Sequence, residues 1–350
     1  MRHQAKKMMF VMLVLAGGLV HVGIVKAESA SEIVASTTKN SAFSSLKWDE
    51  IRPSAMQNES LLSDHPRGRA VVNSNTNDLW IVGERHLWKW SLRDGAMSRV
   101  VLPSETVNSL QLVYASNKLI YGIDSSGAWA FELATKTWSR FDGRFDIKCS
   151  PKKVSPFRPS DEHSLFLMTD CGIFILFFDS KQLIAAGGDK LELNPRFPMT
   201  MASRVGDGSS SLLAIHNQEI LQLSIKGSKI HKELIYTAKS PLLGIVKSGE
   251  WYVAWARQAI IMFDKKMVRQ QVVPVIGTRI ITSFAGTATK HAVGFSDGSI
   301  ELMDLPSKKK WSASKNEYLT QYLDFTTDES LLILSAETSM PRVFSMTNIK

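Results

Sequence analysis

The chain has 350 residues, 44% of them hydrophobic and 21% charged, and its formal net charge is +9. Four of the cations lie in residues 1–27, and removing them leaves +5, a balance that gives no reason to expect nucleic acid as a partner. A chain of this length can bury a large core, and no change of composition marks a second globular domain.

The first 27 residues have the three parts of a secretory signal peptide. Arg2, Lys6 and Lys7 precede an apolar run at 8–25, and Val25-Lys26-Ala27 offers a cleavage site before Glu28. The alternative is an uncleaved membrane anchor, which the glycines and the histidine within the run disfavour. We therefore predict an exported protein, periplasmic or secreted, with no membrane span after cleavage.

Residues 28–42 are rich in Ser, Thr and Ala and have no sustained apolar period, so we expect a flexible N-terminus there. The following segment, SSLKWDEIRP at 44–53, is strand-like.

One short apolar run recurs seven times, at steps of 39 to 47 residues. Its copies are LWKWSL (87–92), AWAFEL (128–133), IFILFF (173–178), ILQLSI (220–225), AIIMFD (259–264), IELMDL (300–305) and RVFSMT (342–347). A second strand-like run precedes each copy, and a third, such as KTWSRF at 136–141, follows most of them. Several strands per unit of this period are typical of a β-propeller blade. The sequence therefore predicts an all-β, seven-bladed propeller over residues 43–350.

The ends of the chain predict how the ring closes. The seventh run ends at Thr347, which leaves no room for a last outer strand, whereas segment 44–53 resembles the outer strands KTWSRF and KKKWSA, with Trp48 in the place of Trp138 and Trp311. We expect this N-terminal strand to complete the seventh blade. The alternative is an open or six-bladed ring.

One blade carries a family resemblance. Residues 295–305, FSDGSIELMDL, resemble the turn and third strand of a WD40 repeat, with Met303 in the place of the Trp of the Trp-Asp pair; DSSG at 124–127 before AWAFEL is a weaker copy. The other blades keep the period but not the residues. The resemblance implies a divergent WD40-like propeller, a fold that usually serves as a binding scaffold.

The two cysteines, Cys149 and Cys171, are expected to form a disulfide, because export is predicted and both residues are expected in loops that a propeller places on one face. The alternative is a pair of free thiols.

No catalytic, cofactor-binding or metal-binding residues are predicted. The histidines show no metal-ligand spacing with a nearby cysteine or carboxylate, and neither a Gly-x-Ser-x-Gly motif nor a phosphate-binding loop is present.

The candidate binding residues lie on the face formed by the turns between second and third strands and by the connections between blades. They are Arg85, His86, Trp255, Arg257 and Arg279. Arginine and tryptophan are enriched at protein-binding hot spots, although Trp255 would equally suit packing between blades. The opposite face is expected to be more acidic.

Together these observations predict a non-catalytic, monomeric protein-binding scaffold of an exported complex in the envelope or secretory pathway, with an acidic protein as partner. The competing hypothesis is a propeller hydrolase or lactonase with a metal-assisted site in the central channel, marked by inward Asp, Glu, Asn or His side chains.

Overall fold

The computed structural model describes residues 44–45, 49–53, 59–60, 62–73, 76–106, 109–145, 154–157, 164–169, 172–188, 201–204, 211–226, 229–275, 277–304, 310–313, 322–326, 328–336 and 339–346. The chain divides into two units, Met1–Ala42 and Phe43–Lys350, and all of these residues belong to the second. The predicted signal peptide and flexible N-terminus therefore lie outside the described residues.

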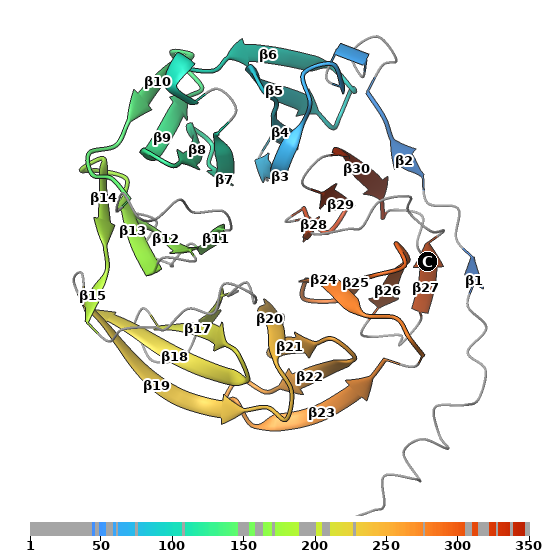
Figure 1. Cartoon of the computed structure of the whole chain (residues 1–350). Helices are drawn as coiled ribbons and strands as arrows, with labels where there is room; N and C mark the ends of the chain where they lie inside the picture. Colours follow the sequence, from blue (N-terminus) through green and yellow to red (C-terminus); the bar gives the residue numbers. More distant parts are fainter. Residues whose placement is uncertain are drawn as a thin grey trace, which may run out of the picture. The chain divides into compact units, whose positions relative to one another are not determined.

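Seven separate sheets are arranged in a ring in chain order (Figure 1). We call them blades 1 to 7. Blade 1 consists of β3 (Arg67–Asn73), β4 (Asp78–Val82), β5 (His86–Ser91) and β6 (Met97–Val101). Blade 2 consists of β7 (Gln111–Ala115), β8 (Leu119–Asp124), β9 (Gly127–Glu132) and β10 (Thr137–Arg140). Blade 3 consists of β11 (Val154–Phe157), β12 (Ser164–Thr169), β13 (Gly172–Phe177) and β14 (Gln182–Ala185).

The next blades have the same order, with two additions. Blade 4 consists of β16 (Met201–Arg204), β17 (Ser211–His216), β18 (Glu219–Lys226) and β19 (Lys229–Thr237). Blade 5 consists of β20 (Leu242–Ser248), β21 (Trp251–Ala256), β22 (Ala259–Phe263) and β23 (Arg269–Pro274). Blade 6 consists of β24 (Ile281–Gly286), β25 (Lys290–Phe295), β26 (Ile300–Asp304) and β27 (Lys310–Ala313). The short strands β15 (Gly187–Gly188) and β1 (Ser44–Ser45) pair in parallel with β19 and β27.

Blade 7 confirms the predicted closure. It contains β28 (Tyr322–Phe325), β29 (Leu331–Ala336) and β30 (Ser339–Ser345), and its outer strand is the N-terminal β2 (Glu50–Ile51), which pairs antiparallel with β30. The first and last parts of the unit are thus joined by strand pairing, which removes an open edge from the ring. Trp48, on which the comparison with the other outer strands partly rested, lies outside the described residues.

The strands are short because tight turns interrupt them. Within each described blade the second strand, such as β4 or β12, is buried along its whole length or nearly so, since it lies between two neighbouring blades. This explains why these strands are continuous apolar runs. Asn217, with φ 57°, and Gly298, with φ 78°, occupy hairpin positions that need left-handed backbone. The helical content of the described part is small: a turn that ends at Asp64 and the 3-10 segment Ser104–Thr106.

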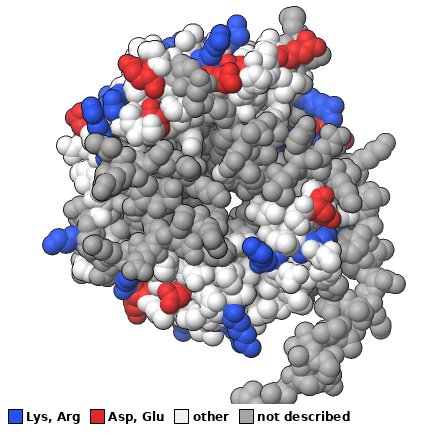
Figure 2. All heavy atoms as spheres, viewed as in Figure 1, with Lys and Arg blue, Asp and Glu red and all other residues white. Residues whose placement is uncertain are grey.

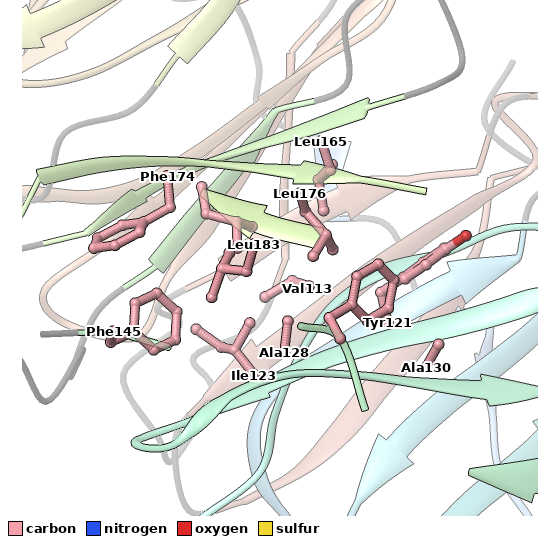
Figure 3. Close-up of a cluster of buried hydrophobic side chains, with 12 residues drawn as sticks. Val113, Tyr121, Ile123, Ala128, Ala130, Phe145, Leu165, Phe174, Leu176 and Leu183 are labelled. Carbon is pink, nitrogen blue, oxygen red and sulfur yellow. The ribbon is translucent and has the colours of Figure 1, made fainter. Parts of the chain in front are cut away.

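Hydrophobic clusters between neighbouring blades hold the ring together. Figure 3 shows the one between blades 2 and 3, where Ile123 and Phe145 face Phe174 and Leu183. The Phe145 and Phe174 rings meet edge to face with their centroids 4.7 Å apart. Similar clusters join the other blades, so each blade depends on its neighbours for a buried face. No described helix is long and apolar enough to cross a membrane.

Candidate functional site

The candidate site lies on the face built by the turns between the second and third strands of each blade and by the connections between blades; we call it the B–C face. Arg85 lies in the β4–β5 turn, with its side chain exposed. Its N–H donates to Asp64 Oδ1 at 3.0 Å, and its carbonyl accepts from Leu102 N–H at 2.9 Å. The backbone that carries this guanidinium is therefore fixed on both sides.

Asp64 organises this turn from below. Its side chain is 7% exposed, and its Oδ2 accepts from Trp88 Nε1 at 2.7 Å and from His86 Nδ1 at 3.2 Å. The carboxylate is buried without a Lys or Arg partner among the described residues, and hydrogen bonds supply its stabilisation instead. His86 is thus turned inward toward Asp64 and is only partly accessible to a partner.

Blade 2 repeats this arrangement with a different source for the acid. Asp124 lies in its own blade's turn, where Oδ1 accepts from the N–H groups of Ser126 and Gly127, at 2.7 and 3.0 Å, and Oδ2 accepts from Trp129 Nε1 at 3.0 Å. Trp129 in β9 and Trp88 in β5 hold equivalent positions. Gly83 N–H donates to the His86 carbonyl at 2.8 Å, Asp124 pairs with Gly127, and each Trp lies two residues after that partner.

An arginine from the outer strand lies over each tryptophan. The Arg99 guanidinium carbon is 5.4 Å from the Trp88 ring centre, and that of Arg140 is 5.6 Å from the Trp129 ring centre. The strand register pairs the two residues in both blades. Stacking reduces the freedom of each exposed guanidinium, so its charge is presented in a defined place.

Arg85, Arg99 and Arg140 form what we call the arginine patch, on neighbouring blades 1 and 2. The outer strands of these blades are linked by Trp138 Nε1, which donates to the Val101 carbonyl at 3.2 Å. Sequence reasoning identified Arg85 but missed Arg99 and Arg140. The sequence feature that could have identified these two residues is a Trp near the start of the third strand and an Arg near the end of the fourth, repeated in two successive blades.

The other predicted residues lie elsewhere on the ring. Arg257 is exposed in the β21–β22 turn, and its carbonyl accepts from Ile281 N–H at 2.8 Å. Arg279, in the connection between blades 5 and 6, is half-buried: it forms an ion pair with Glu301 at 2.7 Å and lies 4.3 Å over the Phe295 ring. Its charge is largely satisfied within the protein.

Trp255 is a packing residue in this structure. It is 5% exposed and stacks on Phe284 of the next blade with centroids 5.3 Å apart. This is the alternative that the sequence left open, so Trp255 is not part of an exposed binding surface. Blade 5 is also three positions around the ring from blade 1, so the structure does not gather the predicted residues into one cluster.

The charges of the described residues form no large region of one sign on the face drawn in Figure 2, where Lys and Arg alternate with Asp and Glu around the periphery. Among the residues that the structure describes, no group of three or more His, Cys, Asp or Glu side chains is arranged to hold a metal ion. Cys149 and Cys171 lie outside the described residues, so their disulfide stays a prediction.

Comparison with known proteins supports the fold. No family model and no curated protein matches the chain. Among solved structures, YCF48 bound to a D1 peptide is similar over 88% of this chain and 100% of its own, with a TM-score of 0.64 and 10% identity. A chain of a mitotic checkpoint complex matches over 80% of this chain and 89% of its own, with a TM-score of 0.58 and 13% identity. These neighbours are WD40-type propellers, which confirms the seven-bladed fold that the repeat predicted.

Proposed function

We propose that this protein is a non-catalytic scaffold of an exported complex, in the envelope or secretory pathway, and that it binds an acidic protein partner through the arginine patch. The observation that carries this proposal is the repeated unit in blades 1 and 2, in which a buried Asp holds a Trp and the Trp supports an exposed Arg. Pre-organised guanidinium groups suit the recognition of carboxylates. Two propellers of similar fold come from a peptide complex and a multiprotein complex, which is consistent with this role.

The mode of binding follows from the chemistry of the patch. Three cations on adjacent blades attract an acidic segment and speed its approach in a salt-dependent way. Arg257 lies on the same face but three blades away, so only a partner large enough to span the ring would contact both places. His86 contributes by holding the turn that carries Arg85.

The test compares two charge-reversed variants of the full chain, expressed in its native cell. In the first, Arg85, Arg99 and Arg140 are replaced with Glu; in the control, Arg93→Glu and Lys118→Glu change exposed cations in turns of the opposite face of the same two blades. Captured partners are quantified at low and high salt, and the intact mass of each bait shows whether residues 1–27 have been removed.

We expect the patch variant to lose partners that the wild type and the control variant retain, with little change in thermal unfolding, because a substitution at an exposed site usually changes stability by less than about 0.5 kcal/mol. A folded patch variant that retains every partner would contradict the proposed binding face. Retention of residues 1–27 in the exported protein would contradict signal cleavage.

A further inference from the structure

The outer edges of the blades differ in whether the chain itself covers them. Ser44–Ser45 pair with the outer edge of β27, and Gly187–Gly188 pair with that of β19. In blade 3, Asp142 exchanges two backbone hydrogen bonds of 2.7 Å with Lys181 and Leu183 beside β14. Extended segments therefore add to the rim of this propeller in three places, each over one or two residues.

The outer edge of β23 in blade 5 has no such cover in the described part of the chain. Figure 1 shows β23 on the outside of the ring, with no labelled strand beyond it. Two valines here are unusually accessible: Val268, just before the strand, at 54%, and Val272, within it, at 45%. A six-residue edge with exposed apolar side chains is a template for a further strand.

The register shows which backbone groups are available on this edge. Val275 N–H donates to the Gln258 carbonyl at 2.8 Å, so Val273 and Gln271 are the residues whose backbone groups point toward β22. The N–H and carbonyl of Val272 consequently point outward. Pro274 also has its nitrogen on the outer side, a position in which proline leaves the ladder intact.

The charge around this edge is positive. Lys265, Lys266 and Arg269 are exposed, and of the three only Lys266 interacts with a described carboxylate, through the effect of its charge on Asp264. The nearby Asp264 is occupied within its own turn, where Oδ1 accepts from Lys266 N–H at 2.8 Å and from Val268 N–H at 3.0 Å. An incoming strand that complements the edge would therefore carry acidic residues beside apolar ones.

We propose that the outer edge of β23 binds an extended segment of a partner protein by strand addition, with Val272 supplying the backbone hydrogen bonds and apolar contact, and Lys265, Lys266 and Arg269 pairing with acidic side chains of that segment. This rim surface is separate from the arginine patch. The proposal therefore stands or fails independently of the binding face proposed above.

Val101 provides a matched control. It is also an exposed valine, 69% accessible, near the end of an outer strand, and its N–H also points outward, because Leu102 N–H donates to the Arg85 carbonyl at 2.9 Å. Its own carbonyl is already occupied by Trp138. Val272→Pro and Val101→Pro thus remove equivalent outward N–H groups from an open and an occupied edge.

The probe is a short synthetic peptide that alternates Glu and Val, with a Lys–Val peptide as the charge control, and the protein is the full chain. We expect the Glu–Val peptide to slow hydrogen exchange at Val272 but not at Val101. Val272→Pro should weaken binding by roughly tenfold, as expected for the loss of one hydrogen bond with its apolar contact, whereas Val101→Pro leaves the affinity unchanged. Arg269→Glu should weaken binding and reduce its salt dependence.

Several outcomes would overturn the proposal. Equal effects of the two proline variants, or equal binding of the Lys–Val peptide, would show that the edge is not recognised. If the peptide does not slow hydrogen exchange at Val272, the role of the lysines and Pro274 is instead to keep other strands from pairing with this edge. Tighter peptide binding after deletion of residues 28–40 would identify the chain's own N-terminal segment as the occupant. If Val272→Pro does not fold, Arg269→Glu decides the question alone.

Discussion

Asp64 lies where a side chain on residue 83 would otherwise be. A Cβ built on Gly83 would come within 2.2 Å of Asp64 Oδ2, and Gly83 follows β4 as Asp124 follows the apolar part of β8. Blade 1 thus receives from the preceding segment the carboxylate that blade 2 carries in its own turn. This contact ties residues before the first blade to the blade itself.

Because Asp64 supplies to blade 1 the carboxylate that blade 2 carries in its own turn, we can predict the effect of a pair of substitutions. Asp64→Ala should destabilise the protein by about 1–3 kcal/mol, because Trp88 Nε1 loses its acceptor in a buried place. Gly83→Asp alone should be at least as harmful, since it clashes with Asp64. The double variant should be more stable than Gly83→Asp alone, although the Asp64 carbonyl, 2.8 Å from the new Cβ, still has to shift. Urea unfolding of the four proteins gives the coupling energy, and strictly additive losses would contradict the replacement.

The ring-closing strand β2 is held by an ion pair between side chains as well as by the pairing of its two residues with β30. Glu50 on β2 accepts from Arg342 of β30 through Nε at 2.8 Å and Nη2 at 3.3 Å, and Arg342 lies 4.9 Å over Phe344. Burial alone would raise the pKa of Glu50, but the hydrogen bonds and charges of Arg342 and Arg52 hold that pKa below its ordinary value. The ionised carboxylate is therefore the form that closes the ring.

We expect Glu50→Ala to lower the free energy of unfolding by about 1 kcal/mol, an amount typical of a partly exposed, bidentate pair. The matched control is Arg52→Ala, because Arg52 also contacts Glu50 but its side chain is 75% exposed, so its contribution should be clearly smaller than that of the pair with Arg342. Because the Glu50 pKa is lowered in the folded state, the contribution is present at neutral pH and disappears as the pH falls through that pKa. Equal urea midpoints for the two variants at pH 7 would contradict a role of this pair in closure.

At the scale of the whole molecule, the sequence predicted what depends on local periodicity and missed what depends on distant partners. The repeat gives the seven blades, and the missing last strand gives the closure by β2, because both can be counted along the chain. The parallel additions β1 and β15 are Ser-Ser and Gly-Gly, which have no strand pattern.

The same reasoning explains the outcome at the candidate site. Arg85 could be placed on the B–C face because its turn is visible in the sequence. The burial of Trp255 against Phe284 and the pairing of Arg279 with Glu301 both depend on side chains from other strands, as does the contribution of Asp64 to blade 1. A pattern read one blade at a time contains no information on these contacts.

One buried histidine links two blades and should make the whole ring sensitive to acid. Ser248 of blade 5 donates to the Thr287 carbonyl and accepts from His291 Nε2 at 2.6 Å, and His291 is 5% exposed. Burial lowers the pKa of His291 to about 4. Folding therefore requires the neutral imidazole over most of the acidic range.

The sign of the pH effect follows from this lowered value. Between pH 6.5 and about 4 the unfolded chain binds a proton at residue 291 that the folded protein does not. The free energy of unfolding therefore decreases as the pH is lowered through this window, by about 3 kcal/mol in all. His291→Gln keeps a donor for Ser248 but does not titrate. The difference in stability between pH 7 and pH 4.5 should therefore be about 2 kcal/mol smaller in this variant than in the wild type. His231→Gln, at an exposed position of β19, should behave like the wild type. Urea midpoints at the two pH values measure all three proteins, and an unchanged acid dependence in His291→Gln would show that the acid sensitivity of the ring arises elsewhere.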